Sequence, residues 1–414
     1  MKILIVSQYF WPESFIINDL ILHLHRLGHE VTVLTGKPNY PDGILFEGYS
    51  EKGIQQESYQ GKIDVFRAPL RPRDSAGSRE LFLNYFSFVF AGLRYFPSFI
   101  KDRKVDAILV FMPSPITAVI PAIPLKWAKK AHLAVWIQDL WPESLAATGH
   151  LRHPLLLKLV GWLVKGIYHF TDSLLIQSRA FRDPVGRLAK SDKIVYYPNS
   201  VDLQPVLNDK EAGLPDELVQ LLGSNFCLVF AGNIGKAQSI ETIVEAAKRL
   251  QDHEHIKIVL VGSGSMLEWV KNQKQTFDLN NLVLTGRYPM QSMPTIYKYA
   301  AALLVTLKDE EIFSYTIPSK IQAYLSTKRP IIAALNGEGT RIIEESGAGL
   351  TGSAEDAEKL AANILAMYAM SQARRDEMGA NGYDYYREHF EMRSQAERLI
   401  EILAERINKN REES

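Results

Sequence analysis

Two glycine-containing loops, each following a predicted strand, have the residue types of an anion-binding site. Gly232-Asn233-Ile234-Gly235-Lys236 precedes a helical pattern, so backbone N–H groups and a lysine can converge on an anion at the helix N-terminus. Gly262-Ser263-Gly264-Ser265 follows the next strand along the chain. A tight turn with a solvated lysine is the alternative for the first loop, and an ordinary glycine turn for the second. Together the two loops favour a diphosphate site.

A third loop in the same half adds acidic and hydroxyl groups. The segment 308–314 carries Glu311 and leads through Pro318 to Ser319 and Lys320, where a helix is predicted to begin. Proline suits a helix start because its missing N–H would be unpaired there anyway. Ser319 and Lys320 then lie at the positive end of the helix dipole, which suits a ribose or a phosphate. The carboxylate of Glu311 can hold sugar hydroxyls, and a solvated acidic loop is the alternative.

Two loops of the N-terminal half combine carboxylates with tryptophans. The strand through Trp136 ends in Gln138-Asp139-Leu140-Trp141-Pro142-Glu143-Ser144, and the first strand ends in Tyr9-Phe10-Trp11-Pro12-Glu13-Ser14. Carboxylates at the end of a buried strand need partners, so these loops are candidates for a second site that borders the same cleft. A capping aspartate with packed tryptophans is the alternative for the first of them.

Strands and helices alternate along the chain and position these loops. Short apolar or β-branched runs, typical of parallel strands buried on both faces, are separated by segments long enough for crossover helices. The predicted strands are 3–7, 31–35, 107–110, 133–136, 173–176 and 195–197, then 227–231, 256–261, 282–284, 302–305 and 330–334. The sequence therefore predicts two doubly wound α/β domains, with ligand sites where their strands end.

A polar connection separates the two predicted domains. Between Pro198 and Pro215 the alternation lapses, as expected for a surface segment between domains. We predict an N-terminal Rossmann-like domain over residues 1–203, a C-terminal Rossmann-like domain over 204–380, and C-terminal helices over 381–414.

Composition narrows the class of function. Of 414 residues, 46% are hydrophobic and 23% are charged, which is ordinary for a globular protein. The 47 lysines and arginines equal the 47 aspartates and glutamates in number, so no global field recruits nucleic acid. The single cysteine, Cys227, fits a reducing compartment, and the ten histidines show no metal-ligand spacing. No Gly-x-Ser-x-Gly elbow or Walker loop occurs, so acyl transfer and nucleoside-triphosphate hydrolysis lack their usual motifs.

The chain resembles the retaining glycosyltransferases of family 4, which have the GT-B architecture. Within them it is similar to a bacterial subgroup of surface-polysaccharide synthesis that includes N-acetylfucosamine transferases. The resemblance covers nearly the whole chain. It is carried by RLGHEVTV at 26–33, WIQDLWPES at 136–144, YPNSVD at 197–202, FAGNIGKAQ at 230–238 and IPSK at 317–320.

The resemblance implies a nucleotide-diphosphate sugar held mainly by the C-terminal domain, retention at the anomeric carbon, and no metal or other cofactor. It assigns Lys236 to the diphosphate leaving group, and it implies that part of the segment 381–414 crosses back to the N-terminal domain. Family 4 pairs two glutamates, and Glu311 matches the first. Counting forward from Glu311, the position expected for the second glutamate holds Ser319. Counting back from Pro330, it holds Ala323. The second glutamate is therefore absent.

These inferences give three groups of expected site residues. Asp139 is expected to orient the acceptor hydroxyl or accept its proton, with Lys236 and Glu311 as the other catalytic residues. The expected donor-binding residues are Gly232, Asn233, Gln238, Gly262, Gly264, Arg287, Ser319 and Lys320. The expected acceptor-side residues are Trp11, Glu13, Trp141 and Glu143.

The expected reaction moves a sugar, N-acetylated, from a UDP donor to a polyprenyl-diphosphate-linked saccharide in O-antigen, capsule or exopolysaccharide synthesis. The expected location is the cytoplasm, with peripheral contact at the inner membrane. A non-hydrolysing UDP-sugar epimerase is the alternative enzyme, since it shares two facing Rossmann-like domains and a UDP site. An inactive sugar-nucleotide-binding subunit is the other alternative, because the second glutamate is missing.

The membrane contact is predicted from one aromatic segment. Arg67, Arg71, Arg73 and Arg79 precede the aromatic run 81–96, and basic residues beside exposed aromatics suit an anionic lipid interface. The alternative is that most of these aromatic side chains form a buried helix face.

Overall fold

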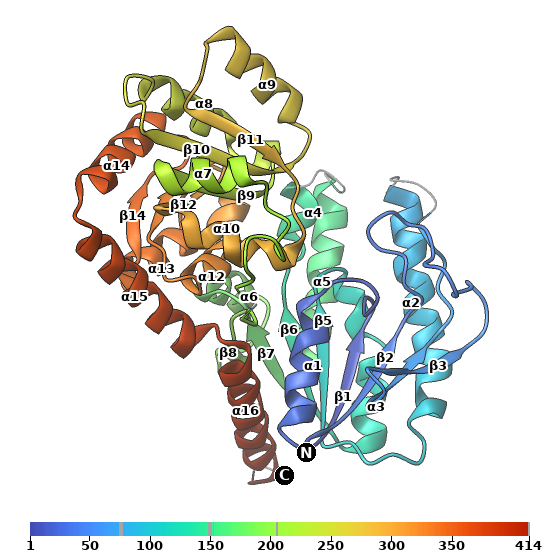
Figure 1. The fold of residues 1–414 in the computed structure, drawn as a ribbon. Helices are drawn as coiled ribbons and strands as arrows, with labels where there is room; N and C mark the ends of the chain where they lie inside the picture. Colours follow the sequence, from blue (N-terminus) through green and yellow to red (C-terminus); the bar gives the residue numbers. More distant parts are fainter. Residues whose placement is uncertain (74–77, 148–150, 152, 204–205, 413–414) are drawn as a thin grey trace. The chain divides into compact units, whose positions relative to one another are not determined.

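The computed structural model describes residues 1–73, 78–147, 151, 153–203 and 206–412. It divides into two compact units (Figure 1). Unit 1 comprises Met1–Ser200 and Met392–Ser414, and unit 2 comprises Val201–Glu391. Within the described ranges, no helix is long and apolar enough to cross a membrane.

Unit 1 is built on an eight-stranded sheet in the order β3-β4-β2-β1-β5-β6-β7-β8. All neighbours are parallel except β3, which pairs antiparallel with β4. The central strands are buried on both faces, which is why they are continuous apolar runs. The strands are β1 Lys2–Ser7, β2 Glu30–Thr35, β3 Gln55–Tyr59, β4 Ile63–Arg67, β5 Ala107–Met112, β6 His132–Ile137, β7 Ser173–Ile176 and β8 Ile194–Tyr196.

Helices cover both faces of this sheet (Figure 1). Helix α1 lies on one face and α2, α3 and α5 lie on the other (Figure 1), and α16 shares one apolar core with α1. The Tyr197 hydroxyl donates to the Gln395 carbonyl at 3.0 Å, which holds α16 to the sheet. The helices are α1 Ile16–Arg26, α2 Ser78–Phe99, η1 Ile116–Val119, α3 Ala122–Lys129, α4 Glu143–Ala147, α5 Pro154–Phe170, η2 Arg179–Phe181, α6 Arg182–Gly186, η3 Ser191–Lys193 and α16 Met392–Glu412.

Unit 2 is built on a six-stranded parallel sheet in the order β11-β10-β9-β12-β13-β14. Side chains of β9 alternate between two cores, with Leu228 and Phe230 in one and Val229 in the other. The strands are β9 Phe226–Asn233, β10 Ile256–Ser263, β11 Leu282–Gly286, β12 Ala302–Thr306, β13 Ile331–Ala334 and β14 Gly349–Gly352. The helices are α7 Asp216–Ser224, η4 Lys236–Gln238, α8 Ile240–Arg249, α9 Leu267–Thr276, η5 Met290–Ser292, α10 Met293–Tyr299, α11 Glu311–Ser314, α12 Ser319–Leu325, α13 Glu338–Ser346, α14 Ala357–Ala369 and α15 Gln372–His389.

The predicted fold class is confirmed, since both sheets are doubly wound and every predicted strand is present. The units divide between Ser200 and Val201, three residues before the predicted boundary, and residues 204–205 lie outside the described ranges. The segment 381–414 is divided between the two units. Its first part lies in α15 of unit 2, and α16 belongs to unit 1.

Candidate functional site

The loops after β9 and β10 lie against each other in unit 2. Strand register pairs Gly232 with Gly262, and the Ile234 N–H donates to the Ser263 carbonyl at 2.9 Å. A Cβ at Gly262 would lie 1.9 Å from the Gly232 oxygen, and one at Gly264 would lie 2.3 Å from the Ile234 oxygen. Glycine is therefore required here because the two loops approach each other closely.

Lys320 fills the space beside Gly232. A Cβ at Gly232 would lie 2.8 Å from the Lys320 Cε. The Lys320 ammonium donates to Gln238 Oε1 at 2.6 Å and lies 3.7 Å from the centroid of the Phe230 ring. Neither partner carries a charge, and no acidic side chain in the described ranges forms an ion pair with it. Burial lowers the pKa of Lys320 from 10.5 to about 7 because desolvation disfavours the charged form.

The glycine loop also contacts the loop after β12. The Thr306 hydroxyl donates to the Gln238 carbonyl at 2.5 Å, and the Lys308 N–H donates to the Ala237 carbonyl at 3.1 Å. Strands β9 and β12 flank the point where the strand order of the sheet reverses. In open α/β sheets, ligands bind beyond the strand ends at this topological switch point.

The other predicted donor-side residues lie exposed on loops and at helix starts of unit 2. Lys236 and Asn233 are exposed on the glycine loop, and Arg287 Nε donates to the Ser263 hydroxyl. Glu311 is exposed and accepts a 2.5 Å hydrogen bond from the Tyr315 hydroxyl. Ser319 is exposed at the start of α12, which has only seven residues. The structure thus brings Gly232, Gly262, Gly264, Gln238 and Lys320 into one cluster.

In unit 1, Glu13 joins the loop after β1 to the loop after β2. Its carboxylate accepts from the N–H groups of Phe10 at 2.9 Å, Asn39 at 2.8 Å and Tyr40 at 2.8 Å. Burial raises the pKa of Glu13 to about 7, and these N–H donors and the charge of Arg67 oppose a larger rise. Both carboxylate oxygens accept from backbone N–H groups, so Glu13 holds the two loops together.

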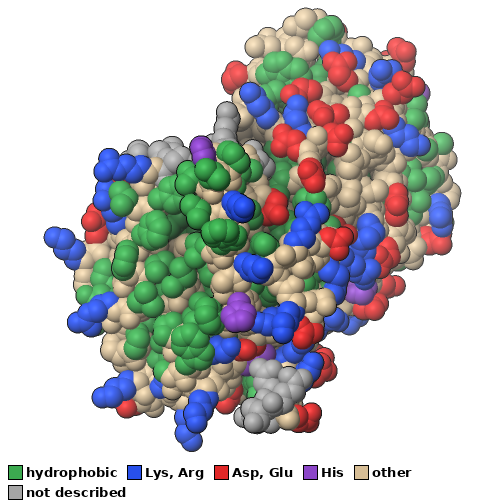
Figure 2. Space-filling model, turned by 180° about the vertical axis from the view of Figure 1, so that it is seen from behind, with side chains coloured by type: hydrophobic (Ala, Val, Ile, Leu, Met, Phe, Trp, Pro, Cys, Tyr) green, Lys and Arg blue, Asp and Glu red, His purple; other side chains and the backbone are tan. Residues whose placement is uncertain are grey.

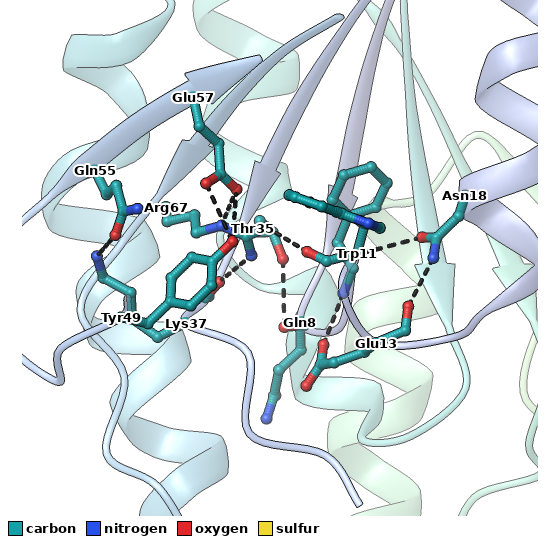
Figure 3. Close-up of polar contacts among 12 residues, drawn as sticks. Gln8, Trp11, Glu13, Asn18, Thr35, Lys37, Tyr49, Gln55, Glu57 and Arg67 are labelled. Carbon is teal, nitrogen blue, oxygen red and sulfur yellow. Dashed lines mark hydrogen bonds and ion pairs between the residues drawn. The ribbon is translucent and has the colours of Figure 1, made fainter. Parts of the chain in front are cut away.

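Arg67 belongs to a buried network and not to a membrane surface. It is fully buried, its Nε lies 2.5 Å from Glu57 Oε1, and it donates to the carbonyls of Gly36 and Trp11 (Figure 3). Lys37 Nζ donates to Gln55 Oε1 at 2.8 Å beside it. The prediction that Arg67 faces lipid is therefore wrong, because the antiparallel strand β3 supplies it with a carboxylate partner.

Asp139 lies at the end of β6, half-buried among hydrogen-bond donors. Its Oδ2 accepts from the Ser144 hydroxyl at 3.1 Å and from Trp141 Nε1 at 3.3 Å. Burial raises the pKa of Asp139, and hydrogen bonds, including one from Ser114, oppose the rise. Glu143 is half-buried at the start of α4. The loop therefore holds two partly exposed carboxylates, Asp139 near the strand end and Glu143 at the start of α4.

Two residues near Asp139 were not predicted from the sequence as site residues. Ser114 hydrogen-bonds with both Asp139 and Tyr85, and the Tyr85 ring lies 6.4 Å from the Trp141 ring. Ser114 follows β5 and Tyr85 lies on α2. The position of Ser114 directly beyond a buried strand was the signal available in the sequence.

Two family models match the chain. Residues 15–200 match a glycosyl transferase 4-like domain, and residues 225–370 match the group 1 glycosyl transferases. The chain is a glycosyltransferase with a glycosyl transferase 4-like N-terminal domain and a group 1 C-terminal domain. Among curated proteins, this glycosyltransferase is 26% identical over 341 residues to the putative colanic acid biosynthesis glycosyl transferase WcaI of Escherichia coli, covering 79% of this chain and 81% of WcaI. It is also 25% identical over 232 residues to the probable glycosyltransferase WbjE of Pseudomonas aeruginosa, covering 55% and 56%.

Solved structures share the GT-B fold with this glycosyltransferase. Sucrose-phosphate synthase from Thermosynechococcus elongatus superposes with a TM-score of 0.70 at 16% identity, covering 98% of both chains. Anabaena HepE in complex with UDP superposes with a TM-score of 0.69 at 14% identity, covering 98% of this chain and 100% of HepE. The expected architecture of two Rossmann-like domains is thus confirmed.

Proposed function

We propose that this glycosyltransferase moves an N-acetylated sugar, with retention and without a metal, from a UDP-sugar to a polyprenyl-diphosphate-linked saccharide. The product would be an O-antigen, a capsule or an exopolysaccharide. The observation that carries the donor part is Lys320, a half-buried lysine with only neutral partners beside two glycine loops. A diphosphate would supply the missing negative charge.

Electrostatics explains how this site would assist the reaction. When the sugar leaves, negative charge grows on the nucleotide diphosphate, and cations already in place stabilise it without reorganisation. Lys320 is fixed by Gln238 and Phe230, while Lys236 is exposed on the same loop as Gln238 and free to approach. HepE, which shares the fold, was solved with UDP, and this supports UDP as the nucleotide.

The acceptor part of the proposal rests on relatives and on unit 1. The names of WcaI and of WbjE describe glycosyltransferases, and that of WcaI specifies colanic acid biosynthesis, which supports a role in surface polysaccharide synthesis. In unit 1, Asp139 offers a partly exposed carboxylate of raised pKa. A carboxylate in that position can accept the proton of an attacking hydroxyl.

Purified protein tests the proposed reaction directly. UDP release from UDP-N-acetylhexosamines should require a polyprenyl-diphosphate-linked monosaccharide in detergent micelles, and NMR of the product should show the anomeric configuration of the donor. A new UDP-sugar epimer formed without acceptor would replace this proposal with an epimerase. UDP binding without turnover on any acceptor would indicate an inactive binding subunit.

The membrane part of the proposal rests on one face of unit 1. Figure 2 shows hydrophobic side chains gathered over this face of the unit, the face covered by α2, α3 and α5. On α5, five apolar side chains are between 41% and 66% exposed, namely Leu155, Leu156, Leu159, Trp162 and Leu163. Helices α3 and α5 contain lysines but no aspartate or glutamate, which suits an anionic lipid surface.

Removing the apolar side chains of α5 should weaken membrane binding. The double variant Leu159→Ser, Trp162→Ser should co-sediment at least about tenfold less with phosphatidylglycerol vesicles, since burying each such side chain is worth about 1.5–3 kcal/mol. A Phe86→Ala, Phe90→Ala variant tests the exposed part of α2 in the same way. Met290→Ser, an exposed residue of unit 2, is the matched control. Unchanged sedimentation of folded variants would remove this face from the membrane contact.

A further inference from the structure

Arg73 stands among three tyrosine rings at the edge of the unit 1 sheet where its parallel strands end. Its Cζ lies 5.4 Å from the ring centroid of Tyr9, 5.8 Å from that of Tyr40 and 5.6 Å from that of Tyr85. The guanidinium donates to the Tyr9 hydroxyl and also hydrogen-bonds with Tyr85. Its Nε, however, is buried and has no hydrogen-bond partner. A buried donor without an acceptor is unusual in a protein and calls for a physical reason.

The charge of Arg73 is not compensated within the described part of the chain. Arg67 pairs with Glu57 at 2.5 Å and Arg71 pairs with Glu80 at 2.8 Å, whereas no described carboxylate lies within ion-pair distance of Arg73. Tyrosine faces attract a guanidinium, but they do not neutralise it. Arg73 is only half-buried and Tyr40 is exposed, so an anion in solution can reach this group.

The position of Arg73 links it to the predicted acceptor site. Tyr9 follows β1 and Ser114 follows β5, and these two strands flank the point where the strand order of the unit 1 sheet reverses. Ser114 hydrogen-bonds with both Tyr85 and Asp139. A single tyrosine and a serine therefore connect the uncompensated cation to the carboxylate predicted to receive the acceptor proton.

We propose that Arg73 binds the diphosphate of the lipid-linked acceptor and so positions the acceptor hydroxyl relative to Asp139. The planar guanidinium presents paired N–H donors that match phosphate oxygens, and the Arg73 side chain is only half-buried, so part of it is accessible to a ligand. This inference rests on the proposed function for the identity of the acceptor. It adds a binding residue on the acceptor side, separate from the donor cluster of unit 2.

Binding of farnesyl diphosphate tests this assignment without turnover. Calorimetry is done with saturating UDP, which occupies the donor cluster so that the second diphosphate cannot bind there. Arg73→Gln should weaken binding about 10- to 100-fold, because a hydrogen bond to a charged group is worth about 1.5–3 kcal/mol. Arg71→Gln, whose arginine is paired with Glu80, should bind as the wild type does. Equal affinity of Arg73→Gln and wild type would overturn the proposal.

Turnover separates this inference from the proposed function and from a packing role. Arg73→Gln should raise KM for a farnesyl-diphosphate-linked acceptor and leave KM unchanged for the same saccharide on an uncharged octyl aglycone. An equal loss on both acceptors would assign Arg73 to packing. If Arg73→Gln instead loses activity only on an octyl glycoside that bears a uronate, Arg73 binds a carboxylate of the sugar and not the diphosphate, which would overturn the assignment.

If Arg73→Gln matches wild type on the lipid acceptor, the inference fails while the proposed function stands. If wild type transfers no sugar yet binds farnesyl diphosphate through Arg73, the proposed function fails alone.

Discussion

Replacing Lys320 with methionine should raise the melting temperature of the ligand-free protein and weaken its binding of a UDP-sugar. Methionine has a similar length and keeps the contact with the Phe230 ring, which Lys320 Nζ approaches to 3.7 Å. It also removes a half-buried charge whose partners are a neutral amide and an aromatic face, and a desolvated charge without a counter-ion opposes folding. Removing one preorganised cation should lower kcat/KM on the order of 10²-fold.

The pH dependence of stability follows from the same residue. Burial lowers the pKa of Lys320 from 10.5 to about 7, so between these values the unfolded chain binds more protons than the folded one. Stability therefore rises with pH across this window. Thermal melts from pH 7 to 9 should therefore show a smaller rise of melting temperature with pH in the Lys320→Met variant than in the wild type.

Donor binding should depend on pH in the opposite direction. A bound diphosphate favours the protonated lysine, so binding takes up a proton above pH 7 and affinity for UDP-N-acetylglucosamine should fall as pH rises. Calorimetry from pH 6.5 to 8.5 measures this, and Lys320→Met should show a flat profile. Lys236→Met is the matched comparison, because that lysine is exposed. It should lower turnover without raising the melting temperature. Wild-type donor affinity in Lys320→Met would remove Lys320 from the donor site.

The sequence predicted the two sheets because their central strands are buried on both faces and thus form continuous apolar runs. Strands β3, with the sequence QQESY, and β14, with GLTG, went unrecognised. The first is an edge strand with polar side chains and the second is half glycine, so their pairing comes from neighbours in space. Strand β4 was also missed, although IDVFR alternates in polarity.

The loops that carry the candidate site were predictable because ligand sites follow strand ends. The contacts that explain why individual residues are needed in these loops were not predictable. Gly232 has a φ of +132°, a conformation that favours glycine, and Lys320 contacts Gln238, which lies 82 residues away in the sequence. Arg67 and Arg73 looked equivalent in sequence, yet β3 gives the first a carboxylate while the second stands among tyrosines. Long-range contacts of this kind decide whether a charge is compensated.

Replacing Asp139 with asparagine should lower kcat about 10²- to 10⁴-fold, the usual worth of a positioned general base. Asparagine keeps the shape of aspartate and an oxygen that can accept from Ser144, which donates to Asp139 at 3.1 Å. The melting temperature and the affinity for the donor should therefore change little. An Asp139→Ala variant that melts early but keeps its turnover per folded molecule would make Asp139 a structural residue only.

The pH–rate profile gives the second readout for Asp139. Burial raises its pKa, and only the ionised carboxylate can accept a proton. The wild-type rate should therefore rise with pH through this raised pKa and then level off, and the rise should be absent in Asp139→Asn. Ser144→Ala removes a hydrogen bond that favours the ionised form, so the rise should move to higher pH. If the rate of Ser144→Ala rises at the same pH as that of the wild type, a different group titrates in the rate-limiting step.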